Sequence, residues 1–141
     1  MSDGTVITEE MKSMIGMETG KAVWEVDKTM LYQVAEAIED PNPRWQEEAS
    51  PGFIATAMIT GAGEHLPDVL FPFKTRVAGG GDWEFYSPIN PGDVVTCTTH
   101  LADIYEREGK AGKLLFLVTE TTVTNQEGSL VAKCRGTGIN Y

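Results

Sequence analysis

The stretch Phe53–Ala62 reads Phe-Ile-Ala-Thr-Ala-Met-Ile-Thr-Gly-Ala and contains no charged side chain. A helix that is apolar on all sides belongs in the interior of a protein, because an exposed side would leave apolar surface in water. Pro51 precedes the stretch, and Gly61 and Gly63 lie near its end, which are ordinary start and stop signals for a helix. We therefore expect a buried central helix that other elements cover.

The chain after this helix is expected to form four antiparallel strands. These strands are predicted at residues 77–86, 94–106, 114–124 and 130–139. The signal is either an alternation of side chains between two faces or an enrichment in Val, Leu, Phe and Thr. Turn residues separate them: a tight turn at 91–93, a hairpin loop at 107–113 and a short hairpin turn at 125–128. Residues 65–73 are expected to form an irregular connection.

A strand and an amphipathic helix are expected ahead of the buried helix. Residues 22–26 predict the strand, and Asp27 is a good N-cap for a helix whose apolar residues lie at helical spacing: Leu31, Val34, Ala35 and Ile38. Pro41 should end this helix, because the residue before a proline resists helical geometry. We expect residues 39–45 to form a rigid, non-helical turn. Thr8 and Met11 indicate a short helix start near the N-terminus.

This order of elements predicts an α+β fold in a single domain that spans residues 1–141. A curved antiparallel sheet can wrap around a buried helix, which is the hot-dog arrangement. Small residues on the strands would let the sheet approach the helix closely: Gly79, Gly80, Gly81, Ala132, Cys134 and Gly136.

The charge of the chain excludes several classes of partner. The net charge is −10, whereas nucleic acids and anionic membrane surfaces need clustered Lys and Arg. Residues 1–50 hold 11 acids and 4 bases, and residues 51–141 hold 10 acids and 7 bases. An anionic ligand should prefer residues 51–141, whereas residues 1–50 should be solvated or face a basic partner.

Two further features indicate a cytoplasmic protein. Cys97 and Cys134 lie in separate strand-like stretches, where we expect reduced cysteines that pack as small hydrophobes. The N-terminal residues carry acids where a signal peptide needs a basic start, and the charge-free stretch 51–63 is too short to span a bilayer.

The segment that ends the amphipathic helix, Asp40-Pro41-Asn42-Pro43-Arg44-Trp45, carries the strongest functional signal. It resembles the Asp-x-Asn-Pro-x-His motif of MaoC-like R-specific enoyl hydratases and dehydratases. In that family, the Asp and the His hold and activate the water that adds to the enoyl double bond. Asp40, Asn42 and Pro43 fit the motif, but Trp45 stands in the His position. An indole has no base that titrates near neutral pH. Taken alone, the segment could simply stop the helix.

The rest of the chain extends the resemblance. Pro51-Gly52-Phe53 resembles the start of the family's central helix, whose backbone N–H groups polarise the thioester carbonyl. The block at 76–93, with its glycines, Trp83 and Pro-Gly-Asp turn, is similar to the N-terminal-type MaoC domain. That branch often lacks the catalytic pair and associates with a second hot-dog domain that supplies it.

The resemblance implies a lyase subunit of enoyl-CoA hydratase or 3-hydroxyacyl-thioester dehydratase type that is itself catalytically incomplete. Its partners would be an acyl-CoA or acyl-carrier-protein thioester and a hot-dog subunit with the Asp/His pair. Asp40 and Asn42 would be the remnants of the motif. The substrate-binding residues would be Gly52, Phe53, Met58, Trp83, Phe85, Lys74 and Arg76, with Lys110 and Lys113 as further candidates for CoA phosphates. No cofactor and no metal are expected.

Two alternatives stay open on the sequence. The chain could be a homodimeric acyl-thioester-binding protein without chemistry, or a hot-dog thioesterase that uses Glu64 or Asp40. The triple glycine at 79–81 is read as a strand bend, because no helix follows it as in a phosphate loop. The sequence does not fix the acyl chain, and fatty acid and steroid side-chain metabolism both stay open.

Overall fold

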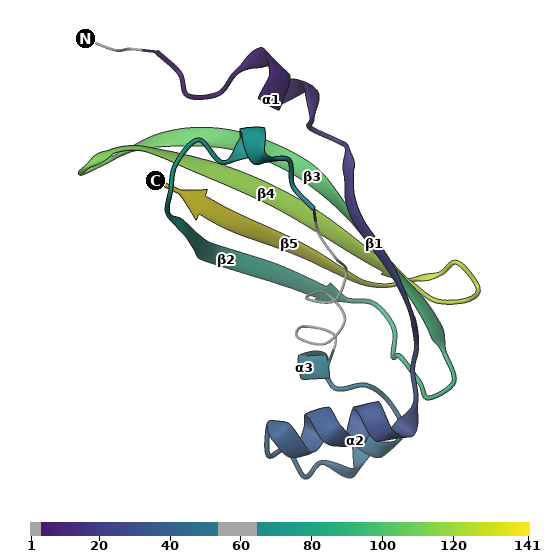
Figure 1. Cartoon of the computed structure of the whole chain (residues 1–141). Coiled ribbons are helices and arrows are strands. Elements are labelled where there is room, and N and C mark those ends of the chain that lie inside the picture. The colour runs from purple at the N-terminus through teal and green to yellow at the C-terminus, as the bar shows by residue number, and fades with distance from the viewer. Residues whose placement is uncertain (1–3, 54–64) are drawn as a thin grey trace.

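The computed structural model describes residues 4–53 and 65–141. A five-stranded antiparallel sheet dominates it (Figure 1), with the strand order β1-β3-β4-β5-β2. The strands are β1 Glu18–Glu25, β2 Arg76–Phe85, β3 Val94–Gly109, β4 Gly112–Thr124 and β5 Leu130–Asn140. The α+β expectation is confirmed.

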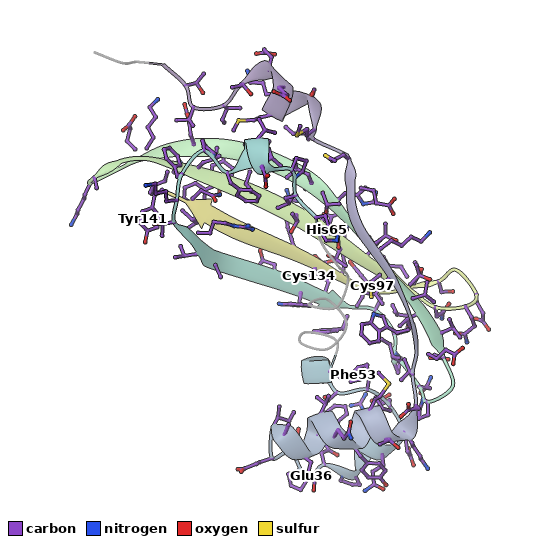
Figure 2. All side chains as sticks on the ribbon, in the orientation of Figure 1. Glu36, Phe53, His65, Cys97, Cys134 and Tyr141 are labelled. Carbon is purple, nitrogen blue, oxygen red and sulfur yellow. The ribbon has the colours of Figure 1, made fainter. Side chains whose placement is uncertain are left out.

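One face of the sheet carries the core because side chains alternate along each strand. On β3 the buried positions include Val95, Cys97, Thr99 and Leu101, and on β4 they include Leu115, Leu117, Thr121 and Val123. Figure 2 shows Cys97 and Cys134 on the sheet, and both are buried and free of a disulfide, as expected. The buried hydroxyls of Thr99 and Thr121 satisfy each other across β3 and β4 at 2.7 Å.

Short helices cover the two ends of this face. At one end, α1 (Glu9–Ser13) and the 3-10 helix η3 (Asp68–Leu70) place Met11 and Leu70 against Leu101 and Leu115. At the other end, α2 (Lys28–Ala37) and α3 (Pro51–Phe53) lie below the sheet in Figure 1. There Leu31 and Phe53 pack in one cluster with β-strand residues such as Val95 and Val123.

Local sequence signals explain most of these boundaries. The Asp27 side chain accepts from Met30 N and caps α2, and Thr8 forms a capping box with Met11. The triple glycine is a strand bend as expected: the pairing of β2 with β5 shifts between Ala78 and Gly80. Gly80 has φ of 155°, a conformation that L side chains rarely adopt.

The structure corrects three expectations. The segment 39–45 is not wholly non-helical, since Asn42 caps a 3-10 helix η1 at Pro43–Gln46. The predicted hairpin loop at 107–113 is much shorter, because β3 continues to Gly109 and β4 starts at Gly112. The connection 65–73 contains η3. The expected central helix lies outside the described residues beyond Phe53, as do Met58 and Glu64.

Candidate functional site

The turn that follows α2 holds the motif residues in one place. Glu39 has a positive φ of 54°, which turns the chain sharply away from the helix axis, and Asp40 N donates to Ala35 O at 3.0 Å. Pro41 then prevents any continuation of α2. Pro43 starts η1, where its fixed φ suits the first helical position. Asp40, Asn42 and Trp45 are thus set on a short, stiff loop.

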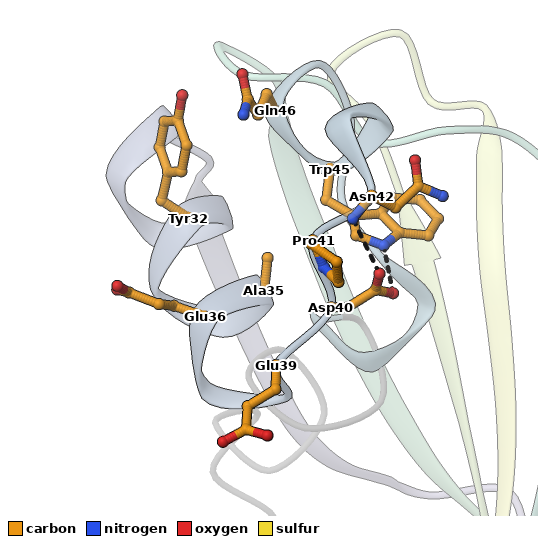
Figure 3. A pocket seen from close by; sticks show the side chains of 9 residues that line it. All are labelled: Tyr32, Ala35, Glu36, Glu39, Asp40, Pro41, Asn42, Trp45 and Gln46. Atoms are coloured by element: carbon orange, nitrogen blue, oxygen red, sulfur yellow. Dashed lines mark hydrogen bonds between the residues drawn. The ribbon is translucent and has the colours of Figure 1, made fainter.

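The Asp40 carboxylate is engaged through both of its oxygens (Figure 3). Oδ1 accepts from the backbone N of Asn42 at 3.1 Å, and Oδ2 accepts from the indole Nε1 of Trp45 at 2.6 Å. The second contact is a short, charge-assisted hydrogen bond. The Trp45 indole therefore occupies one of the two oxygens of the carboxylate. An indole N–H can donate a hydrogen bond but cannot take up a proton.

Asn42 has a structural task in this loop. Its side-chain Oδ1 accepts from Arg44 N at 3.1 Å, and its backbone carbonyl accepts from Trp45 N at 3.1 Å. These two bonds cap η1 and fix the indole in position to meet Asp40.

An open hollow of about 620 Å³ lies between α2 and this loop. Its described lining residues are Tyr32, Ala35, Glu36, Glu39, Asp40, Pro41, Asn42, Trp45 and Gln46. Three of them are carboxylates, and none is a histidine. The α2 side of the hollow was not predicted from the sequence, although Tyr32, Ala35 and Glu36 lie at helical spacing and so share one face of α2.

The start of α3 lies near this loop but is tightly packed. Phe53 is completely buried, and its backbone N–H bonds to Ser50 through the carbonyl at 3.0 Å and the hydroxyl at 3.2 Å. A side chain on Gly52 would lie 3.5 Å from Ile38 Cδ1. The structure thus places the predicted ligand residue Phe53 in the core, with its amide already satisfied.

The other predicted site residues lie on or near β2. Phe85 is exposed at the end of the strand, near Trp45 and Pro51, with which it lines a shallow pocket. Trp83 is half-buried and lines a separate cavity on the core face of the sheet. Arg76 lies at the far end of β2 and also lines that cavity. Its guanidinium stacks over the Phe71 ring, 3.8 Å from the ring centroid.

Of the basic residues predicted for CoA phosphates, Lys113 is engaged by neighbouring groups. Lys113 pairs with Glu106 at 3.5 Å and Glu108 at 3.8 Å, and it donates to Gly4 O at 2.8 Å. Lys74 is exposed just before β2. Burial raises the pKa of Cys97 and of Cys134 to about 11, so neither is an activated thiolate.

Comparisons with known proteins identify the family of the chain. The profile described as "FAS1-like, dehydratase domain region" matches residues 13–134. A "UPF0336 protein" from Thermobifida fusca is 30% identical over 118 residues, covering 74% of this chain and 76% of the relative.

Two solved structures show the same fold. The MaoC-like dehydratase from Rhodospirillum rubrum superposes with a TM-score of 0.68 at 17% identity, over 90% of this chain and 92% of the other. The HadBC (3R-hydroxyacyl-ACP dehydratase) complex from Mycobacterium tuberculosis gives 0.70 at 18% identity, over 90% and 97%. The sheet therefore has the hot-dog architecture predicted from the sequence. Among the described residues, no helix is long and apolar enough to cross a membrane.

Proposed function

The chain belongs to the FAS1-like dehydratase-region family of MaoC-like hot-dog domains, and from this membership we propose that it is a non-catalytic subunit of an enoyl-thioester hydratase or dehydratase. The reaction of that enzyme adds water to the double bond of an enoyl thioester, or removes it in reverse. In this proposal a second hot-dog subunit supplies the Asp/His pair, and this chain shapes the substrate's surroundings.

The observation that carries the proposal is the hydrogen bond from Trp45 to Asp40. Hydration needs a group that takes a proton from water and a group that returns one to the substrate. Asp40 keeps the position of the family's carboxylate, but its Oδ2 is held by an indole 2.6 Å away. Because the indole cannot accept a proton, this loop offers no proton relay.

The open edge of the sheet supports a protein partner. β2 pairs only with β5 in the described part of the chain, and nine of its ten residues are exposed. Phe85 and Tyr86, 46% and 51% exposed, add apolar surface at its end. A free strand edge beside exposed aromatic residues is a site for pairing with another chain. The HadBC structure is a complex, and in this proposal a related hot-dog subunit occupies the β2 edge.

The test is to assay this chain alone and mixed with a hot-dog protein of the same cell that bears Asp-x-Asn-Pro-x-His. We expect hydration of crotonyl-CoA only in the mixture, and the rate should survive Asp40→Ala in this chain. Replacement of the partner's motif histidine should abolish it. Failure of the two chains to associate would refute the proposed role.

A homodimeric acyl-thioester-binding protein is the second candidate, because the same β2 edge could pair with a second copy. Native mass spectrometry separates the two: a stable homodimer that retains acyl-CoA and ignores the dyad-bearing protein would favour this candidate. In either case we expect the protein to act in the cytoplasm on a CoA or acyl-carrier thioester.

A further inference from the structure

The face of the sheet opposite the core carries a row of apolar side chains near the β3–β4 hairpin. Side chains alternate between the two faces along each strand, and the helices α1, α2, α3 and η3 place their buried residues on the core face. Ile104, Leu115 and Leu117 belong to the core, so the residues next to them on β3 and β4 point to the other face. Four such residues are cross-strand neighbours, and we call them the outer row: Tyr105, Phe116, Ile139 and Val77.

The outer row forms accessible apolar surface. Val77 is 42% exposed, and the other three side chains are partly exposed. The rings of Tyr105 and Phe116 are stacked, with 4.7 Å between their centroids. Ile139 lies against Gly79, where an added Cβ would come within 2.9 Å of the isoleucine side chain. The first glycine of the strand bend thus leaves room for an outward apolar side chain. Continuous apolar surface of this kind marks an interaction site.

Two opposite charges lie on either side of the outer row. Asp103 and Arg107 are two positions before and after Tyr105 on β3, and both are exposed on the same face as the tyrosine. Arg107 lies over the Tyr105 ring, 5.5 Å from its centroid. Within the described part of the chain, neither Asp103 nor Arg107 forms an ion pair. Each charge is therefore available to a partner that brings the opposite one.

The neighbouring strands repeat this arrangement with uncharged residues. On β4, Val118 and Leu114 flank Phe116, and they are paired with Asp103 and Arg107 of β3. On the β5 side, Thr137 and Tyr141 flank Ile139, and Figure 2 labels Tyr141 at the end of that strand. One side of the row thus presents an acid, an apolar group and a hydroxyl, and the other side presents a base, an apolar group and a hydroxyl.

A two-fold axis along the outer row would bring these two sides together. The rotation keeps a residue's position across the strands and reverses its position along them, so each residue before the row meets the residue after it in a second copy. The facing pairs would be Asp103 with Arg107, Val118 with Leu114, and Thr137 with Tyr141. The outer row itself would meet its own copy, in the aligned packing that two sheets adopt at a spacing of about 10 Å.

We propose that the outer row is a two-fold interface with a second copy of this chain. Two molecules of net charge −10 repel each other, whereas this patch holds one acid and one base and adds no net charge. The inference goes beyond the proposed function, which assigns the hot-dog partner to the β2 edge. Because the second copy binds the opposite face of the sheet, an assembly with that partner would contain two of each chain.

Sedimentation equilibrium of the purified full chain is the first experiment. We expect a homodimer that Asp103→Arg and Arg107→Asp each weaken at least tenfold, because like charges would then face each other. Lys21→Glu reverses an exposed charge on the same face of β1, away from the outer row, and should associate as the parent does. A parent that stays monomeric, or single variants that dimerise like the parent, would overturn the proposal.

Mixing the two single variants tests the two-fold geometry itself. Two acids of one chain would then face two bases of the other, so the mixture should form a 1:1 heterodimer in native mass spectrometry although neither variant dimerises alone. The double variant Asp103→Arg/Arg107→Asp restores both pairs and should dimerise like the parent. Recovery also shows that the single variants are folded. Failure of both recoveries would overturn the proposal.

The β2 edge is the competing site for a second copy. A homodimer that Phe85→Asp dissociates, and that both charge variants leave intact, would place the contact on that edge and overturn the outer-row interface. None of these measurements depends on hydration, so the interface and the proposed function can fail separately.

Discussion

At the scale of single residues, the exchange of an imidazole for an indole at position 45 changes what Asp40 does. In the family's motif the carboxylate and the histidine share a water, whereas here the carboxylate accepts from Trp45 Nε1 and from Asn42 N. The loop keeps its shape through those bonds and gives up its proton chemistry. Asp40 is thus an internal acceptor that holds a turn.

Trp45→Phe tests this structural task. The variant keeps an aromatic ring but removes the donor to a carboxylate, and hydrogen bonds to charged groups contribute about 1.5–3 kcal/mol. We expect a loss of about 1 kcal/mol in the free energy of unfolding, because Asp40 is only half-buried and water can replace part of the contact. Urea unfolding measures it, with Tyr32→Phe in the same hollow as control. Equal stability of the two variants would contradict the account.

Trp45→His tests whether the loop still has catalytic geometry. The imidazole would stand at the motif position next to Asp40, so we expect the variant to hydrate crotonyl-CoA above background, with a rate that rises through the histidine pKa. Trp45→Gln offers a donor without a base and should stay at background. Equal rates in both variants would mean that the loop cannot position a water.

The buried cysteines predict a pH dependence of stability. Burial raises the pKa of both thiols to about 11 in the folded chain, compared with 9.0 for an ordinary thiol. Between these values the unfolded chain loses thiol protons that the folded chain keeps, so the free energy of unfolding should fall as pH rises from 9 to 11. Cys97→Ala/Cys134→Ala should flatten this dependence in urea titrations at constant ionic strength. An unchanged slope in the double variant would contradict the assignment.

At the scale of elements, the two edges of the sheet offer a matched comparison. β2 carries exposed Phe85 at one edge, and β1 carries Val23, which is 61% exposed, at the other. The β2 edge leads to the apolar surface of Phe85, Tyr86 and Pro88 beside the Trp45 loop. If partner binding uses the β2 edge, a charge introduced there should weaken binding strongly, whereas a charge introduced on β1 should leave binding unchanged.

Phe85→Asp should weaken binding of the dyad-bearing partner at least tenfold, since a carboxylate would be buried among apolar groups at the interface. Val23→Asp should leave the affinity unchanged. Surface plasmon resonance gives both dissociation constants, and circular dichroism checks that both variants fold. A loss of affinity in Val23→Asp alone would place the interface on the β1 edge and contradict this prediction.

The elements also show what sequence alone can predict. Asp27 and the spacing of Leu31 and Val34 were sufficient to place α2, because the cap and the apolar face are local features. The short hairpin at 110–111 was missed because polar, glycine-containing residues look like a loop even when strand pairing extends through them. The Trp45–Asp40 bond was not foreseen, since it depends on how η1 folds back after Pro43.

At the scale of the whole molecule, the fold places the Asp40 loop and the hollow between β2 and β5 in different parts of the structure. The Asp40 loop lies near the Phe85 end of β2, and Arg76 and Asn140 line a separate hollow that includes the other end of that strand. The resemblance to a known motif directed attention to the Asp40 loop from the sequence. Asn140 drew no attention in the sequence, because the burial of its polar side chain becomes visible only in the folded chain.

The central claim is that this chain has no acid–base pair of its own, and hydration of crotonyl-CoA by the purified chain alone tests it most directly. We predict a rate no greater than that of buffer, for the parent and for Asp40→Ala alike. A substantial rate in the parent that disappears in Asp40→Ala would contradict the account.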